Sequence, residues 1–195
     1  MSLREKKIEK KKQEILRSAA EVLYEKGYHG ATMEEIASRL LMTKGSVYYY
    51  FKNKEDLLYQ VHMVIIDISL QTIEEIMARD QSPTEKLRDA IVSHIELAIS
   101  EKPMFAIIDN PDQTFSGEHL QEIVKLRSKY AHCFDDILKE GVEKGEFSKI
   151  DIKLTRMIIL GAMNWIQQWY SPDGERSKEE IAQTFSESLL KMVLK

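Results

Sequence analysis

The sequence predicts an all-α protein of about nine helices, and two observations lead to that prediction. Eight glycines and four prolines, the residues that most often interrupt helices, are spread over 195 residues. Apolar residues recur three and four positions apart along most of the chain, whereas no segment shows a convincing alternating strand pattern. With 43% apolar and 31% charged residues, the composition is typical of a globular chain long enough to bury a core.

The first helix is predicted over residues 7–26. Its apolar side chains follow the helical spacing, and Gly27 stands where a helix commonly ends. The preceding stretch REKKIEKKK carries six basic and two acidic residues. This stretch contributes to a basic N-terminal part of the chain.

Two short helices follow, predicted over residues 33–40 and 43–50. Thr32 and Glu35 have the spacing of a capping box, in which each side chain bonds the other residue's backbone amide. Thr43 supplies a capping hydroxyl for the second helix. The few residues between the two helices match the spacing of a helix-turn-helix.

The rest of the chain is predicted to be a larger helical body over residues 54–195. Its start signals are SPTE, SKID and SKEE, each with a capping side chain followed three residues later by an acidic residue. The predicted helices are residues 54–79, 82–101, 117–144, 148–170 and 177–194, with a short helical or irregular piece at 103–111.

Charge is distributed unevenly between these parts. Residues 1–60 carry 12 Lys and Arg against 9 Asp and Glu, and the remainder carries 16 against 23, which together give the net charge of −4. A basic head on an acidic body is compatible with a polyanion-binding module, and equally with ordinary solvated helix faces. The single cysteine, the absence of a secretory signal and the absence of a membrane-length apolar run predict a cytoplasmic protein.

The stretch from Gly27 to Leu58, GYHGATMEEIASRLLMTKGSVYYYFKNKEDLL, resembles the DNA-binding segment of TetR-family transcriptional regulators. The shared features are the Gly-aromatic end of the first helix, T-x-x-x-I-A, G-S-V-Y-Y-Y-F and K-x-E-x-L. The nine-helix layout extends the resemblance over the whole chain. It implies a ligand-responsive regulator, by family habit a repressor, that binds a palindromic operator as a dimer and is not an enzyme.

The resemblance makes residues 43–50 the recognition helix, whose first residues meet base edges in the major groove. Lys44 can donate to guanine, and Gly45 has no side chain to hold the helix off the groove floor. Tyr48 lies about one turn further along the same face, and the hydroxyls of Tyr49 and Tyr50 can reach phosphates on either side. Val47 and Phe51 point inward. The predicted DNA-binding set is Thr32, Met33, Thr43, Lys44, Gly45, Ser46, Tyr48, Tyr49, Tyr50 and Lys54, with Met33 directed at a base methyl and Thr32, Ser46 and Lys54 at phosphates. A protein-partner patch or half-buried core is the alternative for the tyrosines.

One residue departs from the family pattern. The turn between the two short helices usually carries glycine in this family, and here Leu41 stands in its place. Leucine is costly in the left-handed conformation that glycine adopts easily. We therefore expect either a turn of different conformation or a strained one.

The C-terminal run G-A-M-N-W-x-x-x-W-Y-x-P-x-G, from Gly161 to Gly174, resembles KstR2-like members of the family, which respond to acyl-CoA thioesters of lipid or sterol breakdown. It implies a small hydrophobic effector, with acyl-CoA as the candidate, and a homodimer formed through the last two helices. The predicted ligand-binding residues are Met104, Phe105, Ile108, Phe115, Tyr130, Phe134, Met157, Leu160, Met163, Asn164 and Trp165. Ordinary core packing is the alternative for the Met and aromatic members, and a bond to a neighbouring helix or the dimer mate is the alternative for Asn164.

Two other function classes compete with this interpretation: a helical protein-interaction adaptor and a small helical enzyme. The five histidines form no HExxH motif, and the chain has no glycine-rich phosphate loop. His132 beside Cys133 is compatible with a thiol or metal site, but the pattern favours an ordinary core or surface pair. We expect no cofactor and no bound metal.

Overall fold

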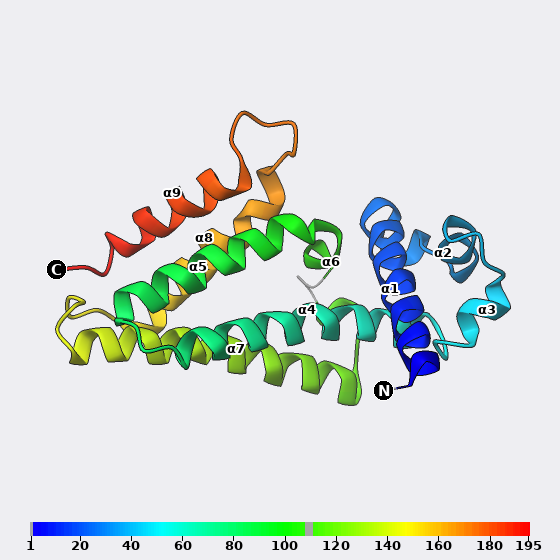
Figure 1. The fold of residues 1–195 in the computed structure, drawn as a ribbon, viewed down its shortest axis with the longest axis horizontal. Coiled ribbons are helices and arrows are strands. Elements are labelled where there is room, and N and C mark those ends of the chain that lie inside the picture. Colours follow the sequence, from blue (N-terminus) through cyan, green and yellow to red (C-terminus); the bar gives the residue numbers. More distant parts are fainter. Residues whose placement is uncertain (1, 108–110) are drawn as a thin grey trace. The chain divides into compact units, whose positions relative to one another are not determined.

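The computed structural model describes residues 2–107 and 111–195. These residues form nine α-helices and one short 3₁₀-helix with no strand, which confirms the all-α prediction (Figure 1). Ile108, one of the predicted ligand-binding residues, lies outside the described residues. The elements are α1 (Leu3–Gly30), α2 (Met33–Arg39), α3 (Lys44–Tyr48), α4 (Lys54–Met77), α5 (Pro83–Ser100), α6 (Lys102–Ala106), η1 (Pro111–Gln113), α7 (Gly117–Glu143), α8 (Ile152–Trp169) and α9 (Lys178–Leu190).

Helix α1 begins four residues earlier than predicted. The side chain of Ser2 accepts a hydrogen bond from the Glu5 amide at 3.2 Å, and the Ser2 amide donates to the Glu5 carboxylate at 2.7 Å. This capping box satisfies amides that would otherwise fray the first turn. At the other end, Gly27 interrupts the helical geometry at φ 70°, where the sequence predicted the stop, before one further turn reaches Gly30.

The predicted start signals at Thr32, Ser82 and Ser177 are confirmed, whereas SKID does not start its helix at residue 148, because Asp151 and not Ser148 is the cap. Capping boxes precede α2, α5 and α9, formed by Thr32 with Glu35, Ser82 with Glu85 and Ser177 with Glu180. Helix α8 begins after Asp151, whose carboxylate accepts a hydrogen bond from the Leu154 amide at 2.9 Å. These bonds join residues three apart, and the local sequence is therefore sufficient to set them.

Helix α9 ends at Leu190 rather than at the predicted residue 194. The chain leaves the helix because its last residues pair with the segment before α8. The Ser148 amide donates to the Val193 carbonyl at 2.7 Å, and Phe147 and Leu194 form an isolated antiparallel bridge. Periodicity alone does not report such a long-range backbone contact.

The chain forms two compact units. The head unit comprises residues 1–65 and 103–124, and the body unit comprises residues 66–102 and 125–195. Helices α4 and α7 each contribute one part to either unit. The predicted domain division at residues 1–53 and 54–195 stays a prediction.

The head unit has a core built from apolar side chains of α1, α2, α3 and the first half of α4. Its fully buried members include Ile15, Ile36, Val47, Phe51 and Leu57. Val47 and Phe51 are the inward pair predicted for the recognition helix. Their burial anchors α3 and leaves its other face available to a partner.

The body unit has its own core, in which α5 packs against α8 and α9 (Figure 1). Ile91, Ile95, Phe134, Ile159 and Met163 are among its buried members. No helix in residues 2–107 and 111–195 is long and apolar enough to cross a membrane.

Candidate functional site

Helix α3 presents an exposed face that carries most of the predicted DNA-binding residues. Tyr48 is 43% and Tyr49 69% exposed, which is unusual for two adjacent large aromatic side chains. Lys44 and Gly45 are exposed on the preceding turn. Tyr50 is half-buried, and its ring meets that of Tyr49 edge-on at 5.0 Å.

The hydroxyls near the start of α3 are occupied by capping. Thr43 Oγ1 accepts a hydrogen bond from the Ser46 amide at 3.2 Å and lies 2.8 Å from the Ser46 hydroxyl. In the same way, Thr32 caps α2 through the Glu35 amide at 3.2 Å. The caps place these exposed hydroxyls at helix starts, where backbone amides favour an anion such as phosphate.

The two lysines predicted to meet DNA are held by the protein itself. Lys44 pairs with Glu34, which raises the pKa of Lys44 and lowers that of Glu34 through their hydrogen bond. Lys54 donates to the Tyr28 carbonyl, and its ammonium lies 4.1 Å from the centroid of the Tyr28 ring, while burial lowers its pKa. Lys44 must leave Glu34 to reach a base, and Lys54 ties the end of α1 to the start of α4.

The side chain of Met33 is buried, although it was predicted to face DNA. It is only 4% exposed and packs in the core of the head unit, because it occupies the inward face of α2. A buried methionine offers no surface to a base methyl group in this conformation. We therefore leave Met33 out of the groups that the head presents to DNA.

Leu41 adopts the left-handed conformation that glycine usually supplies, with φ 53°. Its amide donates to the Ser38 carbonyl at 3.0 Å, and the Met42 amide donates to the Ala37 carbonyl at 2.8 Å. This bond pattern is the Schellman helix ending, which requires a left-handed residue. The turn therefore keeps the glycine geometry and carries strain, and the leucine side chain is 97% exposed.

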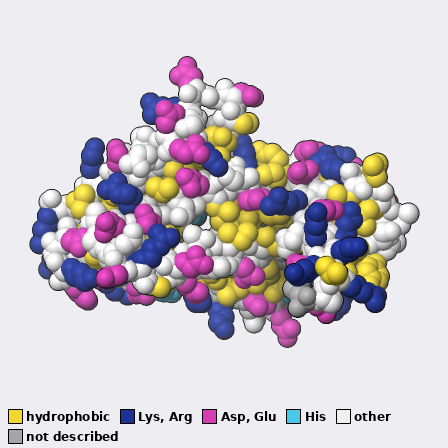
Figure 2. Space-filling view, in the orientation of Figure 1, with side chains coloured by type: hydrophobic (Ala, Val, Ile, Leu, Met, Phe, Trp, Pro, Cys, Tyr) yellow, Lys and Arg dark blue, Asp and Glu magenta, His cyan; other side chains and the backbone are white. Residues whose placement is uncertain are grey.

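Basic side chains are unevenly neutralised across α1, α2 and α3. Lys26 and Arg39 pair with carboxylates of the head, as Lys44 does. Within the residues that the structure describes, the basic residues of the first turns of α1 without an ion pair are Arg4, Lys6, Lys7, Lys10 and Lys12. Figure 2 shows Lys and Arg side chains over the head as well as over the rest of the visible face. The unpaired basic residues give the first turns of α1 a positive charge suited to a polyanion.

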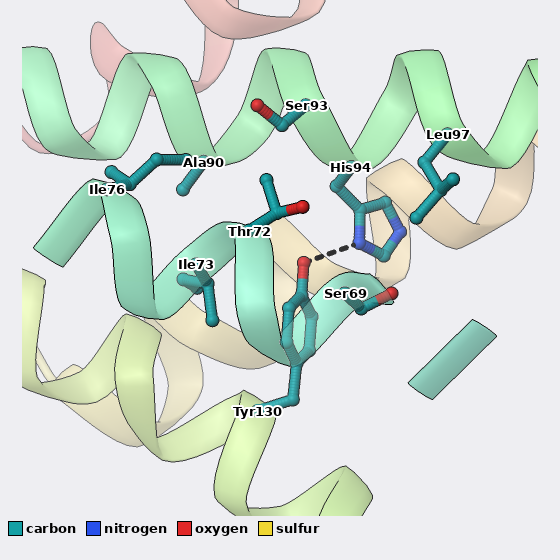
Figure 3. A pocket seen from close by; sticks show the side chains of 9 residues that line it. All are labelled: Ser69, Thr72, Ile73, Ile76, Ala90, Ser93, His94, Leu97 and Tyr130. Carbon is teal, nitrogen blue, oxygen red and sulfur yellow. Dashed lines mark hydrogen bonds between the residues drawn. The ribbon is translucent and has the colours of Figure 1, made fainter. Parts of the chain in front are cut away.

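The body unit contains a small cavity bounded by α4, α5 and α7 (Figure 3). Its free space is about 10 Å³, which is room for about one water molecule. An acyl chain therefore requires the cavity to open. The lining residues are Ser69, Thr72, Ile73, Ile76, Ala90, Ser93, His94, Leu97 and Tyr130.

A chain of hydrogen bonds runs from this cavity to helix α8. The Tyr130 hydroxyl lies 2.9 Å from His94 Nδ1, and His94 Nε2 lies 3.1 Å from Asn164 Oδ1. We call these three residues the polar chain. Figure 3 shows the Tyr130 and His94 side chains pointing toward one another inside the cavity.

The protonation state of the polar chain follows from burial. Burial lowers the pKa of His94 to about 4, so that its imidazole is neutral at pH 7. A neutral imidazole has one N–H, and Asn164 Oδ1 can only accept. The proton of His94 therefore lies on Nε2, and Nδ1 accepts the Tyr130 hydroxyl, whose pKa burial raises.

Several predicted ligand-binding residues lie together in the body unit. The Tyr130 and Phe134 rings are 5.5 Å apart, and Phe134 and Met163 are buried in the same core, with Leu160 packed against it. Asn164 joins them through the polar chain. In the head unit, Met104, Phe105 and Phe115 are buried, and the Phe115 ring meets His62 edge-on at 4.9 Å.

Met157 and Trp165 lie on an exposed face of α8 instead. They are 56% and 64% exposed, and neither lines the cavity between α4, α5 and α7. Met157 and Leu160 instead line an open groove on the surface of α7 and α8, together with His132 and Arg156. The same face carries Leu154, Ile158 and Trp169, which makes an apolar stripe along α8.

His94 is the cavity residue that sequence reasoning did not select. It lies on the buried side of α5 with Leu87, Ile91 and Ala98, and it is itself buried. A histidine at a core position of an amphipathic helix must find hydrogen-bond partners. The position of His94 among the core residues of α5 could therefore have marked it as a buried polar residue, but it does not identify Tyr130 or Asn164 as the partners.

The adjacent residues His132 and Cys133 point in different directions. His132 is exposed and its Nδ1 lies 2.7 Å from the Ser128 carbonyl, whereas Cys133 is buried and burial raises its pKa. A raised pKa disfavours the reactive thiolate. Over the described ranges, no three His, Cys, Asp or Glu side chains are grouped as a metal site requires.

Two family models match the chain. Residues 15–61 match the model described as bacterial regulatory proteins, tetR family, and residues 80–193 match the tetracyclin repressor-like C-terminal domain. The first range contains the helix-turn-helix, and the second contains α5, α7, α8 and α9.

Curated relatives and solved structures of regulators resemble most of the chain. The fatty acid metabolism regulator protein of Bacillus subtilis is 29% identical over 152 residues, which are 77% of this chain and 78% of the relative. The transcriptional repressor KstR2 of Mycolicibacterium smegmatis is 27% identical over 90% of this chain and 86% of its own. The crystal structure of AibR in complex with isovaleryl coenzyme A and operator DNA has a TM-score of 0.80 and 26% identity, with 94% of this chain and 97% of that chain covered.

Proposed function

Because the chain belongs to the TetR family of bacterial regulatory proteins, we propose that it is a dimeric repressor that releases a palindromic operator when a small hydrophobic effector binds. The candidate effector is an acyl-CoA thioester. The observation on which the DNA-binding assignment rests is the exposed face of α3, with Tyr48 and Tyr49 outward and Val47 and Phe51 buried. Contact with DNA would explain why two tyrosines are exposed to water beside a basic segment.

Gly45 supports the same assignment by the space around it. A β-carbon built at this position has no neighbour closer than 4.0 Å, and therefore alanine fits the free protein and favours the helix. The fold itself therefore does not require glycine at this position, whereas a close approach of the helix to the floor of the DNA groove does. The proposed contact set is Thr32, Thr43, Lys44, Gly45, Ser46, Tyr48, Tyr49 and Tyr50, with Lys54 supporting the head through Tyr28.

The test uses a duplex selected from a random library by the wild-type protein. Changing Tyr48 and Tyr49 together to alanine is expected to lower affinity for that duplex by about a hundredfold, and Gly45→Ala by about tenfold. Dimer formation should be unchanged in both variants, and neither should melt below the wild type, because Tyr48 and Tyr49 are exposed and alanine fits at position 45. Wild-type affinity in the double variant would show that α3 does not read DNA.

The effector proposal rests on the cavity of the body unit and on the relatives. One relative is named for fatty acid metabolism, and the AibR structure contains isovaleryl coenzyme A. The cavity combines apolar walls with a few polar groups, as small-molecule sites commonly do. Of the predicted ligand set, Tyr130 lines the cavity, the Phe134 ring contacts that of Tyr130, and Asn164 is bonded to His94 of the cavity wall. Met163 is buried in the core of the same unit, and Leu160 packs against that core.

The dimer is proposed to form through α8 and α9. The exposed apolar stripe of α8 is larger than scattered surface residues require, and water exposure of such a stripe is unfavourable. Trp169 stacks on Phe185 of α9 with centroids 6.1 Å apart, and therefore the two helices share this face. Two heads held by such a dimer read half-sites about 34–36 Å apart.

The proposed switch is a shift between two populations of conformations. Helix α4 begins in the head unit and supplies Ser69, Thr72, Ile73 and Ile76 to the cavity wall. An effector that opens the cavity must displace this wall, and α4 transmits the displacement to the helix-turn-helix. The shift is limited by the difference between the effector's affinities for the two conformations.

A further inference from the structure

We propose that the polar chain of Tyr130, His94 and Asn164 is the element that selects the effector, and that it recognises an uncharged carbonyl group by donation from the Tyr130 hydroxyl. The inference rests on the proposed effector function and narrows the class of effector. The end of the effector that enters the cavity is a neutral acyl derivative, such as a thioester, and a free carboxylate does not bind there.

The exclusion of carboxylates follows from the charges around the cavity. None of the residues that line it is a lysine or an arginine. His94 does not replace them, because with a pKa of about 4 only about one molecule in a thousand is protonated at pH 7. A buried carboxylate would therefore have no positive partner, whereas a carbonyl needs only one hydrogen-bond donor.

The donor is available only if the polar chain reverses. In the structure, the single hydroxyl proton of Tyr130 is directed at His94 Nδ1, and the imidazole proton on Nε2 is directed at Asn164 Oδ1. To donate to an effector, Tyr130 must accept from His94 instead, which moves the imidazole proton from Nε2 to Nδ1. His94 Nε2 then becomes an acceptor and needs a donor.

Asn164 is able to supply that donor. Its side chain lies at the exposed face of α8, and within the part of the chain that the structure describes its amide nitrogen has no hydrogen-bond partner. A half-turn of the amide places the NH₂ group toward His94 Nε2. The bonds between Tyr130 and His94 and between His94 and Asn164 are then kept in both states, and the imidazole proton is exchanged with water while the cavity is open.

The reversal also connects the effector to the surface next to Trp165. When the effector binds, Asn164 presents its carbonyl rather than its amide hydrogens at the exposed face of α8. The polar chain thus changes the chemistry of the proposed dimer face without a change of charge. Asparagine can bond His94 in both states because its side chain has both a carbonyl acceptor and an amide donor. A side chain with only one of these groups could bond His94 in only one state.

The test compares two ligands that differ only in the carbonyl: octanoyl-CoA and its thioether analogue S-octyl-CoA. Binding to the wild type is expected to be about tenfold tighter for the thioester, the contribution of one buried hydrogen bond. Tyr130→Phe should bind the two ligands equally. Tyr170→Phe, which removes a hydroxyl from a tyrosine that does not line the cavity, is the matched control and should keep the tenfold preference. Octanoate should bind far more weakly than either CoA ligand.

The second measurement follows the nitrogen resonances of His94. Two-dimensional ¹H–¹⁵N spectra distinguish the two tautomers, and octanoyl-CoA should move the proton from Nε2 to Nδ1 while S-octyl-CoA should not. Equal affinities of the wild type for thioester and thioether, or an unchanged tautomer, would overturn this inference and leave the effector class standing. If neither CoA ligand binds the wild type, the proposed effector class fails and this inference fails with it.

Discussion

Replacing Leu41 by glycine should stabilise the protein. Leu41 holds a left-handed conformation, φ 53°, in the turn of the helix-turn-helix, and its side chain is 97% exposed. For a residue with a β-carbon, that conformation costs about 1–2 kcal/mol. Glycine avoids the cost but gives the unfolded chain more freedom, which offsets about 0.4–1 kcal/mol. The difference is a gain of about 1 kcal/mol, because the exposed leucine has almost no packing to lose.

The assay is thermal and urea unfolding at one fixed protein concentration, since a dimer's stability depends on concentration. A gain of about 1 kcal/mol in a chain of this length raises Tm by about 2–4 °C. Leu41→Ala is the control, because alanine keeps the β-carbon and therefore the strain, and its Tm should stay near that of the wild type. Equal melting temperatures for the glycine and alanine variants would refute the argument from backbone strain.

Three further predictions concern the body unit. The pKa of His94 is about 4 in the folded protein against 6.5 normally, and the unfolded chain therefore takes up a proton at higher pH than the folded protein. The free energy of unfolding should fall by about 3 kcal/mol as the pH drops from 6.5 to 4. His94→Gln should remove this part of the pH dependence of urea unfolding. Gly141→Ala places a β-carbon within 2.1 Å of the Phe147 ring and should cost about 3 kcal/mol; Phe147→Leu in the same chain should recover part of it, whereas strictly additive losses would contradict the clash. Trp165→Lys should yield a folded monomer in sedimentation analysis, and a fully dimeric variant would argue against the α8 interface.

Much of the fold could be predicted because its signals are local. Capping boxes join residues three positions apart, and the face that an amphipathic helix buries follows from its spacing. The exposed tyrosines and the inward Val47 of α3 are examples. Helix ends were less predictable when another segment decided them, as for α9, which stops at Leu190 because Val193 pairs with Ser148. The start of α1 at Leu3 was missed although its signal, the capping box of Ser2 and Glu5, is local.

The sequence by itself determined that the chain is helical, that a helix-turn-helix lies near its N-terminus, and that Leu41 stands where glycine is usual. Only the tertiary structure decided the cavity and its chemistry. His94 is 36 residues from Tyr130 and 70 residues from Asn164. Partners so distant are brought together by tertiary packing of α5, α7 and α8, which no local pattern specifies. Likewise, only packing removed Met33 from the DNA face and turned Trp165 outward, because the same helical spacing is compatible with either face.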